Sequence, residues 1–286
     1  MIKSNYKKFL LENLNNDTLE YFMFDWDDNI LVMPSVIHVD HLINGEWTPV
    51  DLSTSEFSEI RPDIYKTING EQTDWRLRNN NYRDTYSEFR DYGKRGQAAF
   101  IDDMIKAIKT NSFGPVWDTF IQCIISGHVF MIITARGHEP ETIRLAIQWI
   151  IWNYFNPSQI TELEKNLIDF NILFNYDDTN LDFNGLVNHY LDLCDFIGFS
   201  SEYFTKKYNT EGQVVNPEKY KSMAIRSFIE KINEFGKRVN KKVSVGFSDD
   251  DQLTTKHVHK YMKDELSLDF PMDYNVYYTK NGITKL

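Results

Sequence analysis

Short apolar runs of strand length alternate with helical segments along this chain, and that alternation limits the folds it can adopt. The runs are Leu19–Asp25, His128–Thr134, Asp195–Ser200, Lys241–Phe247 and Asp273–Thr279. They are rich in β-branched and aromatic residues, as strands buried on both faces usually are. Amphipathic segments lie between them, such as Asn216–Phe235, where Pro217 stands near the start of a predicted helix. This order predicts an α/β domain with a mainly parallel sheet.

Composition excludes several classes of function. The chain has 286 residues and a formal net charge of −11, which disfavours bulk binding to nucleic acid or to an anionic membrane. Cys123 and Cys194 lie in apolar surroundings without a CxxC partner, so we expect free thiols in a reducing compartment. The polar N-terminus has no apolar signal core, and the most apolar window is too short to span a bilayer. We therefore expect a soluble, cytoplasmic protein.

Residues 34–114 interrupt the strand–helix alternation and read as an insertion. Two β-rich runs flank Asn44-Gly45, which is a strong signal for a hairpin turn. A long polar stretch with interleaved Arg, Asn and aromatic residues follows from Ser53 to Gly96, and Ala98–Lys109 is predicted to be a helix. The predicted core is then 1–33, beginning with an amphipathic helix over Ile2–Leu14, and 115–286. A second, smaller insertion is expected within 156–194, where 169–178 reads as a strand or loop.

Acidic residues crowd the ends of two predicted strands. Asp25, Asp27 and Asp28 follow the first run, and Asp249, Asp250 and Asp251 follow the fourth. The carboxyl ends of parallel strands meet at one edge of a sheet, so both groups should lie close together. Like charges brought together in this way repel, and a hard divalent ion such as Mg²⁺ with oxygen ligands is the usual solution.

Four motifs in order resemble the haloacid dehalogenase superfamily of aspartate-dependent phosphohydrolases. "FDWDDNIL" is similar to the family pattern DxDxT, "IIT" ends in Thr134, "KSMAI" begins at Lys221, and "FSDDD" is similar to the acidic motif. Asp28 and Asn29 stand where the family usually has Gly and Thr. The resemblance implies a Rossmann-like three-layer sandwich, with residues 34–114 as a cap over the site.

The resemblance also implies a role for each matched residue. Asp25 would be the nucleophile, Asp27 the general acid and base, and Thr134 and Lys221 the groups that bind phosphate. Mg²⁺ would be held by Asp25, Asp249, Asp250 and the backbone carbonyl of Asp27. Lys219, and more weakly Lys207, are alternatives to Lys221, and Asp250 with Asp251 is the alternative acidic pair. Arg136, Arg90 and Arg95 are candidate substrate contacts, although a solvated basic loop is the favoured explanation of the last two.

The expected function is hydrolysis of a small phosphomonoester through an aspartyl-phosphate intermediate. One alternative is a nucleotide or nucleic-acid-end phosphatase, in which the Arg- and aromatic-rich insertion grips a base or sugar. Another is a metal- or phosphate-binding module without turnover. A further hypothesis is that the insertion mediates formation of a homo-oligomer.

Overall fold

The apolar runs pair with one another in a single sheet. The computed structural model describes residues 17–91, 96–176, 181–211 and 216–286. The sheet has six strands in the order β6-β5-β1-β7-β8-β9, and every neighbouring pair is parallel except β8 with β9. Its strands are β1 (Thr18–Phe24), β5 (Phe130–Thr134), β6 (Asp195–Gly198), β7 (Lys242–Asp249), β8 (Asp273–Tyr278) and β9 (Thr284–Lys285). The predicted α/β class with a mainly parallel sheet is confirmed.

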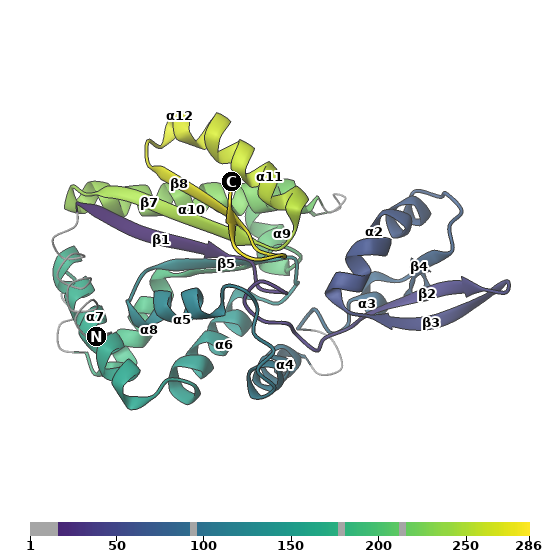
Figure 1. The fold of residues 1–286 in the computed structure, drawn as a ribbon, viewed down its shortest axis with the longest axis horizontal. Helices are drawn as coiled ribbons and strands as arrows, with labels where there is room; N and C mark the ends of the chain where they lie inside the picture. Colours follow the sequence, from purple (N-terminus) through teal and green to yellow (C-terminus); the bar gives the residue numbers. More distant parts are fainter. Residues whose placement is uncertain (1–16, 92–95, 177–180, 212–215) are drawn as a thin grey trace.

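Helices cover both faces of this sheet, which is compatible with a Rossmann-like sandwich (Figure 1). On one side lie α4 (Gln97–Lys109), α5 (Trp117–Ile125), α6 (Pro140–Asn153), α7 (Pro157–Phe174) and α8 (Phe183–Leu193). On the other side lie α9 (Glu202–Tyr208), α10 (Pro217–Val239), α11 (Gln252–Tyr261), the π-helical turn η2 (Met262–Leu266) and α12 (Ser267–Asp269). Among the described residues, every helix is too short or too polar to cross a membrane.

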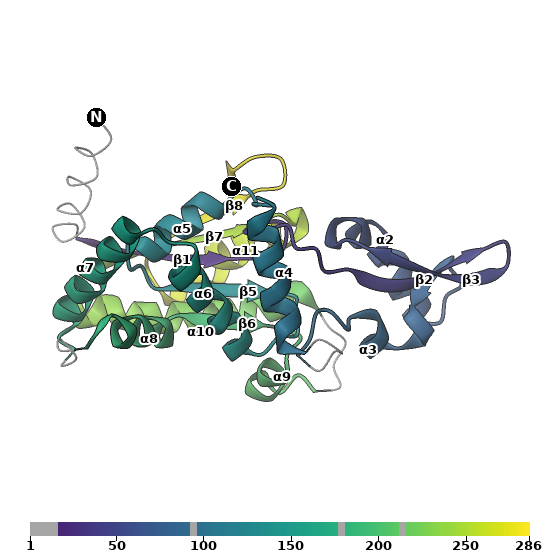
Figure 2. The same ribbon diagram turned by 90° about the horizontal axis from the view of Figure 1, so that it is seen from below.

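A smaller unit lies to one side of the main sheet (Figures 1 and 2). It contains β2 (Ile37–Ile43), β3 (Glu46–Leu52), α2 (Thr54–Ile68), β4 (Trp75–Leu77), the 3-10 turn η1 (Arg78–Asn80) and α3 (Tyr82–Thr85). Its antiparallel sheet has the order β3-β2-β4, and the hairpin turns at Asn44-Gly45 as predicted. We call this unit, residues 37–85, the small lobe.

The small lobe has a hydrophobic cluster of its own. Ile37, Val39, Phe57, Ile64 and Leu77 form this cluster together with Phe89, whereas the larger cluster fills the space around the main sheet. Helix α4, which the sequence placed in the insertion, contributes to the larger cluster. The insertion's role as a cap stays a prediction.

Two helices differ from the sequence-based expectation: α7 is longer than expected, and α2 was not expected. Residues 169–174, expected as a strand or loop, continue α7, because one helical face is buried through Leu163, Leu167, Asn171 and Phe174. Helix α2 occupies part of the polar stretch that received no assignment. It begins with a capping box in which Ser53 and Glu56 exchange hydrogen bonds. The predicted helix over Ile2–Leu14 lies outside the described residues.

We predict that His138 makes the fold acid-sensitive. Its side chain is fully buried beside Phe100, and burial, with the nearby Arg136 and Arg90, lowers its pKa to about 2. The unfolded chain takes up this proton below about pH 6.5 while the folded chain stays neutral, so stability is lost as pH falls, by about 1.4 kcal/mol per pH unit. Urea unfolding between pH 7 and 4.5 should show a shallower loss for His138→Leu than for the wild type.

A matched control is His257→Gln, since His257 is exposed on α11. It should reproduce the wild-type dependence of the unfolding free energy on pH. Parallel curves for His138→Leu and the wild type would contradict the assignment.

Candidate phosphate and metal site

Three strands deliver their last residues to one edge of the sheet. In the strand register, Phe24 of β1 lies opposite Ile132 of β5 and Ser248 of β7. Asp25 therefore follows β1 beside Asp249, and Thr134 lies one position further along β5. The chain order reverses about β1, from β5 and β6 on one side to β7 and β8 on the other. Such a switch point is where open α/β sheets form their binding crevices.

A buried lysine joins two of these strand ends. Lys221 Nζ lies 2.7 Å from Asp25 Oδ1 and 2.5 Å from Asp249 Oδ2, and the side chain is almost fully buried. Its position follows from the start of α10, where Asn216 caps the helix and Pro217 occupies the first turn. Lys219 is exposed two residues earlier. Of the two candidate lysines, Lys221 is the one that reaches the acidic residues.

The carboxyl groups around Lys221 carry more negative charge than one ammonium can balance. Carboxylate oxygens of Asp25, Asp249 and Asp250 all lie within 4.8 Å of one another. Burial raises the pKa of each; Lys221 opposes this shift, and Asp249 with Asp28 helps to raise the pKa of Asp250 to about 7. For Lys221, burial lowers the pKa, but Asp249 and Asp25 outweigh it and the net shift is upward.

Oxygen-only ligands with excess negative charge are what Mg²⁺ prefers, so these residues fit that ion. Asp251, the alternative acid, points to other partners. It caps α11 by accepting from Thr254 N at 2.9 Å, and Arg61 Nη2 lies 3.5 Å from its Oδ2. Within the described residues, one group of three side chains could hold a metal ion, and its members are Asp25, Asp249 and Asp250.

Asp27 is held by an arginine. Arg136 Nε donates to Asp27 Oδ2 at 2.9 Å and Nη2 donates to Oδ1 at 2.6 Å, while Thr134 Oγ1 donates to Oδ2 at 3.3 Å. The Arg136 guanidinium is fully buried, with its carbon 4.2 Å from the centre of the Phe89 ring. Arg136, expected to contact substrate, lines the cavity, but its guanidinium is occupied by Asp27.

Asn29 connects three elements behind the site. Its Nδ2 lies 3.1 Å from the Asp25 carbonyl oxygen and 3.1 Å from both the carbonyl and hydroxyl oxygens of Ser248. Its Oδ1 accepts from Thr279 Oγ1, just after β8, at 2.8 Å. The amide therefore ties the loop after β1 to the ends of β7 and β8. Its neighbour Asp28 has φ 57°, in the left-handed region that favours glycine.

The loop that follows β1 also packs closely against Gly114. A Cβ on Gly114 would lie 2.2 Å from the Asn29 carbonyl oxygen, so only glycine permits the chain to pass there. On the small-lobe side, Thr54 Oγ1 donates to Asp28 Oδ2 at 2.7 Å. Burial raises the pKa of Asp28, and the Thr54 hydrogen bond opposes that shift.

A cavity of about 520 Å³ opens above these side chains, between the main sheet and the small lobe. The predicted residues Asp25, Asp27, Thr134, Arg136, Lys221, Asp249, Asp250 and Arg90 all line it. Arg90 donates through Nη1 to the Ser200 carbonyl at 2.7 Å. Arg95 lies outside the described residues.

The sequence interpretation did not identify several cavity residues. Thr54, Arg61 and the aromatic side chains of α2 and α3 line the cavity from the small lobe. The Ser53–Glu56 capping box was an available sequence signal for the start of α2. On a helix that begins there, Thr54 and Arg61 are seven residues apart and therefore share a face. The bond network of Asn29 had no sequence signal, because it depends on β8.

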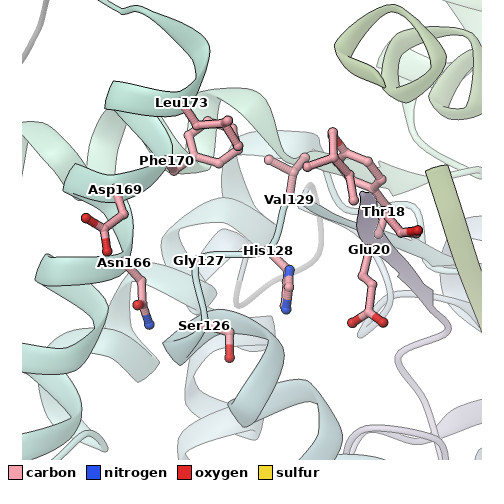
Figure 3. A pocket seen from close by; sticks show the side chains of 12 residues that line it. Thr18, Glu20, Ser126, Gly127, His128, Val129, Asn166, Asp169, Phe170 and Leu173 are labelled. Atoms are coloured by element: carbon pink, nitrogen blue, oxygen red, sulfur yellow. The ribbon is translucent and has the colours of Figure 1, made fainter. Parts of the chain in front are cut away.

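A smaller cavity of about 100 Å³ lies at the opposite, amino-terminal edge of the sheet. Figure 3 shows Thr18, Glu20, His128, Asn166 and Asp169 around it. Burial lowers the pKa of His128 to about 4. This cavity lies at the amino-terminal ends of the strands, so Lys221 and the acidic residues of the candidate site do not line it.

Comparisons with protein-family models, with curated proteins and with solved structures found no match to this chain.

We predict that Asn29→Ala destabilises the protein by about 3 kcal/mol, since it leaves buried backbone and hydroxyl groups without partners. Urea unfolding measures this loss. The control Thr279→Val removes only the bond to Asn29 Oδ1 and should cost about 1 kcal/mol. Equal costs for the two variants would show that Asn29 does not connect the strand ends.

Proposed function

We propose that this protein is a Mg²⁺-dependent phosphomonoester hydrolase that acts through an aspartyl-phosphate intermediate. The observation that carries the proposal is the position of Lys221 between Asp25 and Asp249, at the switch point of the sheet, with a third carboxylate beside them. This arrangement offers a nucleophile, a cation for phosphate and oxygen ligands for a metal in one place. It agrees with the resemblance to the haloacid dehalogenase superfamily.

The proposed chemistry divides among four side chains. The Asp25 carboxylate attacks phosphorus, the bond from phosphorus to the ester oxygen breaks, and the alcohol leaves with a proton from Asp27. Water then attacks the aspartyl-phosphate, Asp27 takes a proton from that water, and inorganic phosphate leaves. Lys221 and Thr134 bind the phosphoryl oxygens during both steps. In the structure Asp27 is paired with Arg136, so its acid role requires the carboxyl to leave that salt bridge.

Asp25, Asp249 and Asp250, with the backbone carbonyl of Asp27, would hold Mg²⁺. When bound, the ion supplies positive charge that offsets repulsion between the Asp25 carboxylate and the phosphate. The protein's own contribution is to bring these oxygens together on rigid strand ends and to exclude water from them by burial.

The pairing of Asp27 with Arg136 favours a second candidate function, a phosphate- and metal-binding module without turnover. In that case the site binds phosphate through Lys221 and the metal but hydrolyses no ester. Measurement of turnover separates the two functions.

We predict that Asp25→Asn lowers kcat toward phosphomonoesters by at least about a thousandfold, because the nucleophile is lost. A screen of nucleotides, sugar phosphates and phosphorylated ends with added Mg²⁺ identifies the substrate for this assay. Asp273→Asn is the matched control, since Asp273 is exposed at the start of β8, away from the site. Turnover by Asp25→Asn near the wild-type rate would exclude the aspartyl-phosphate route.

We also predict that Mg²⁺ stabilises the protein in the absence of any substrate. At about 100 times its Kd, the ion should add about 2.7 kcal/mol, or a rise in Tm of roughly 5 °C. Asp249→Asn should remove this rise, and Asp273→Asn should retain it. Titration with Mg²⁺ in a thermal unfolding assay makes the measurement. An unchanged wild-type Tm would contradict the metal site.

A further inference from the structure

The cavity above Asp25 has two ends of different chemistry. One end holds the carboxylates and Lys221, as described above. The other is lined by Phe57 and Tyr65 of α2, Tyr82 of α3 and the following Tyr86. We call these four side chains the aromatic wall. Phe57 belongs to the small-lobe cluster, and Tyr86 packs against that cluster.

The rings of the aromatic wall hold one another in place. Phe57 and Tyr86 meet edge to face with centroids 5.9 Å apart, and Tyr82 lies nearly parallel to Tyr86 at 6.1 Å. Tyr65 and Tyr82 nevertheless remain 37% and 46% exposed. Ring surface is therefore available toward the cavity, supported by rings that are packed. Such a surface offers stacking to a flat, aromatic ligand.

Polar groups lie beside the aromatic wall. Ser55, Ser58 and Arg61 of α2 line the same cavity, as does Gln252 at the start of α11. These side chains supply hydrogen-bond donors and acceptors of the kind that read the edge of a base or the hydroxyls of a sugar. The cavity volume of about 520 Å³ falls within the range of sites that enclose a small ligand.

We propose that the aromatic wall binds the base of a nucleoside monophosphate, whose phosphate then lies at Asp25 and Lys221. This inference rests on the proposed function for the placement of the phosphate. A sugar phosphate or an aliphatic phosphomonoester has no planar group to stack on these rings. The net charge of −11 and the acidic residues Asp250 and Asp251 on the cavity lining favour a mononucleotide over a polynucleotide end.

Binding of hydrolysis-resistant analogues tests this inference without depending on turnover. Isothermal titration calorimetry, with Mg²⁺ present, compares 5′-phosphonate analogues of the nucleoside monophosphates with the phosphonate analogue of ribose 5-phosphate. At least one nucleoside analogue should bind about tenfold or more tightly than the ribose analogue, because the base adds stacking.

Variants assign that preference to the aromatic wall. Tyr82→Leu combined with Tyr65→Leu should reduce the preference for the base to about twofold or less. Tyr82→Phe keeps the ring and should retain the preference. Tyr203→Leu, an exposed tyrosine on α9 outside the cavity lining, is the matched control and should behave as the wild type.

Failure of this inference and failure of the proposed function give different results. Equal binding of nucleoside and ribose analogues, or an unchanged preference in the double variant, overturns the aromatic subsite even if the enzyme hydrolyses phosphomonoesters. Tighter binding of a 5′-phosphorylated oligonucleotide than of any mononucleotide overturns the choice of ligand. A preference for the base without measurable turnover supports the aromatic subsite and contradicts the proposed hydrolase activity.

Discussion

The contact of Lys221 with Asp25 and Asp249 is the interaction on which the rest of the site depends. An ammonium group buried this deeply is stable only when carboxylates surround it, and buried carboxylates need the ammonium in return. The three groups come from α10, from the end of β1 and from the end of β7. Removal of Lys221 would leave the two carboxylates with uncompensated charge in a low-dielectric environment. The site and the packing of α10 on the sheet are therefore coupled.

The fold makes this contact through strand order. Because β5 and β7 flank β1, the residues that follow these three strands lie side by side at one edge of the sheet. Asn29 then fixes the loop after β1 against Ser248 and Thr279, so Asp25 is oriented by backbone hydrogen bonds as well as by charge. Asn29 suits this position because its amide bonds to three elements at once, with both a donor and an acceptor.

Much of the main sheet could be predicted from sequence because its strands are buried on both faces. Runs such as Phe130–Thr134 carry a signal that does not depend on their neighbours. The acidic strand ends could be grouped for a related reason, since parallel strands bring their carboxyl ends to one edge. The end of α7 was missed because Asn171 occupies a buried helical position, which breaks the apolar periodicity.

The partners of individual side chains could not be predicted in the same way. Arg136 lies two residues after Thr134, and Asp27 lies two residues after Asp25. Their pairing depends on the register between the strands β1 and β5, which the sequence alone does not show. The polar stretch that forms α2 and α3 was harder still. Its buried positions, Phe57, Ile64 and Thr85, are too sparse to define a period without the hairpin against which they pack.

The small lobe is tied to the site by polar contacts rather than by a shared hydrophobic core. Thr54 donates to Asp28, and Arg61 approaches Asp251, so α2 contacts both acidic segments at their outer residues. Such contacts are weak and partly exposed, and they separate at low cost compared with a buried apolar interface. Helix α2 also carries Phe57 and Tyr65, so any movement at these two contacts moves part of the aromatic wall relative to Asp25. The two ends of the cavity are thus built on units that have separate hydrophobic clusters.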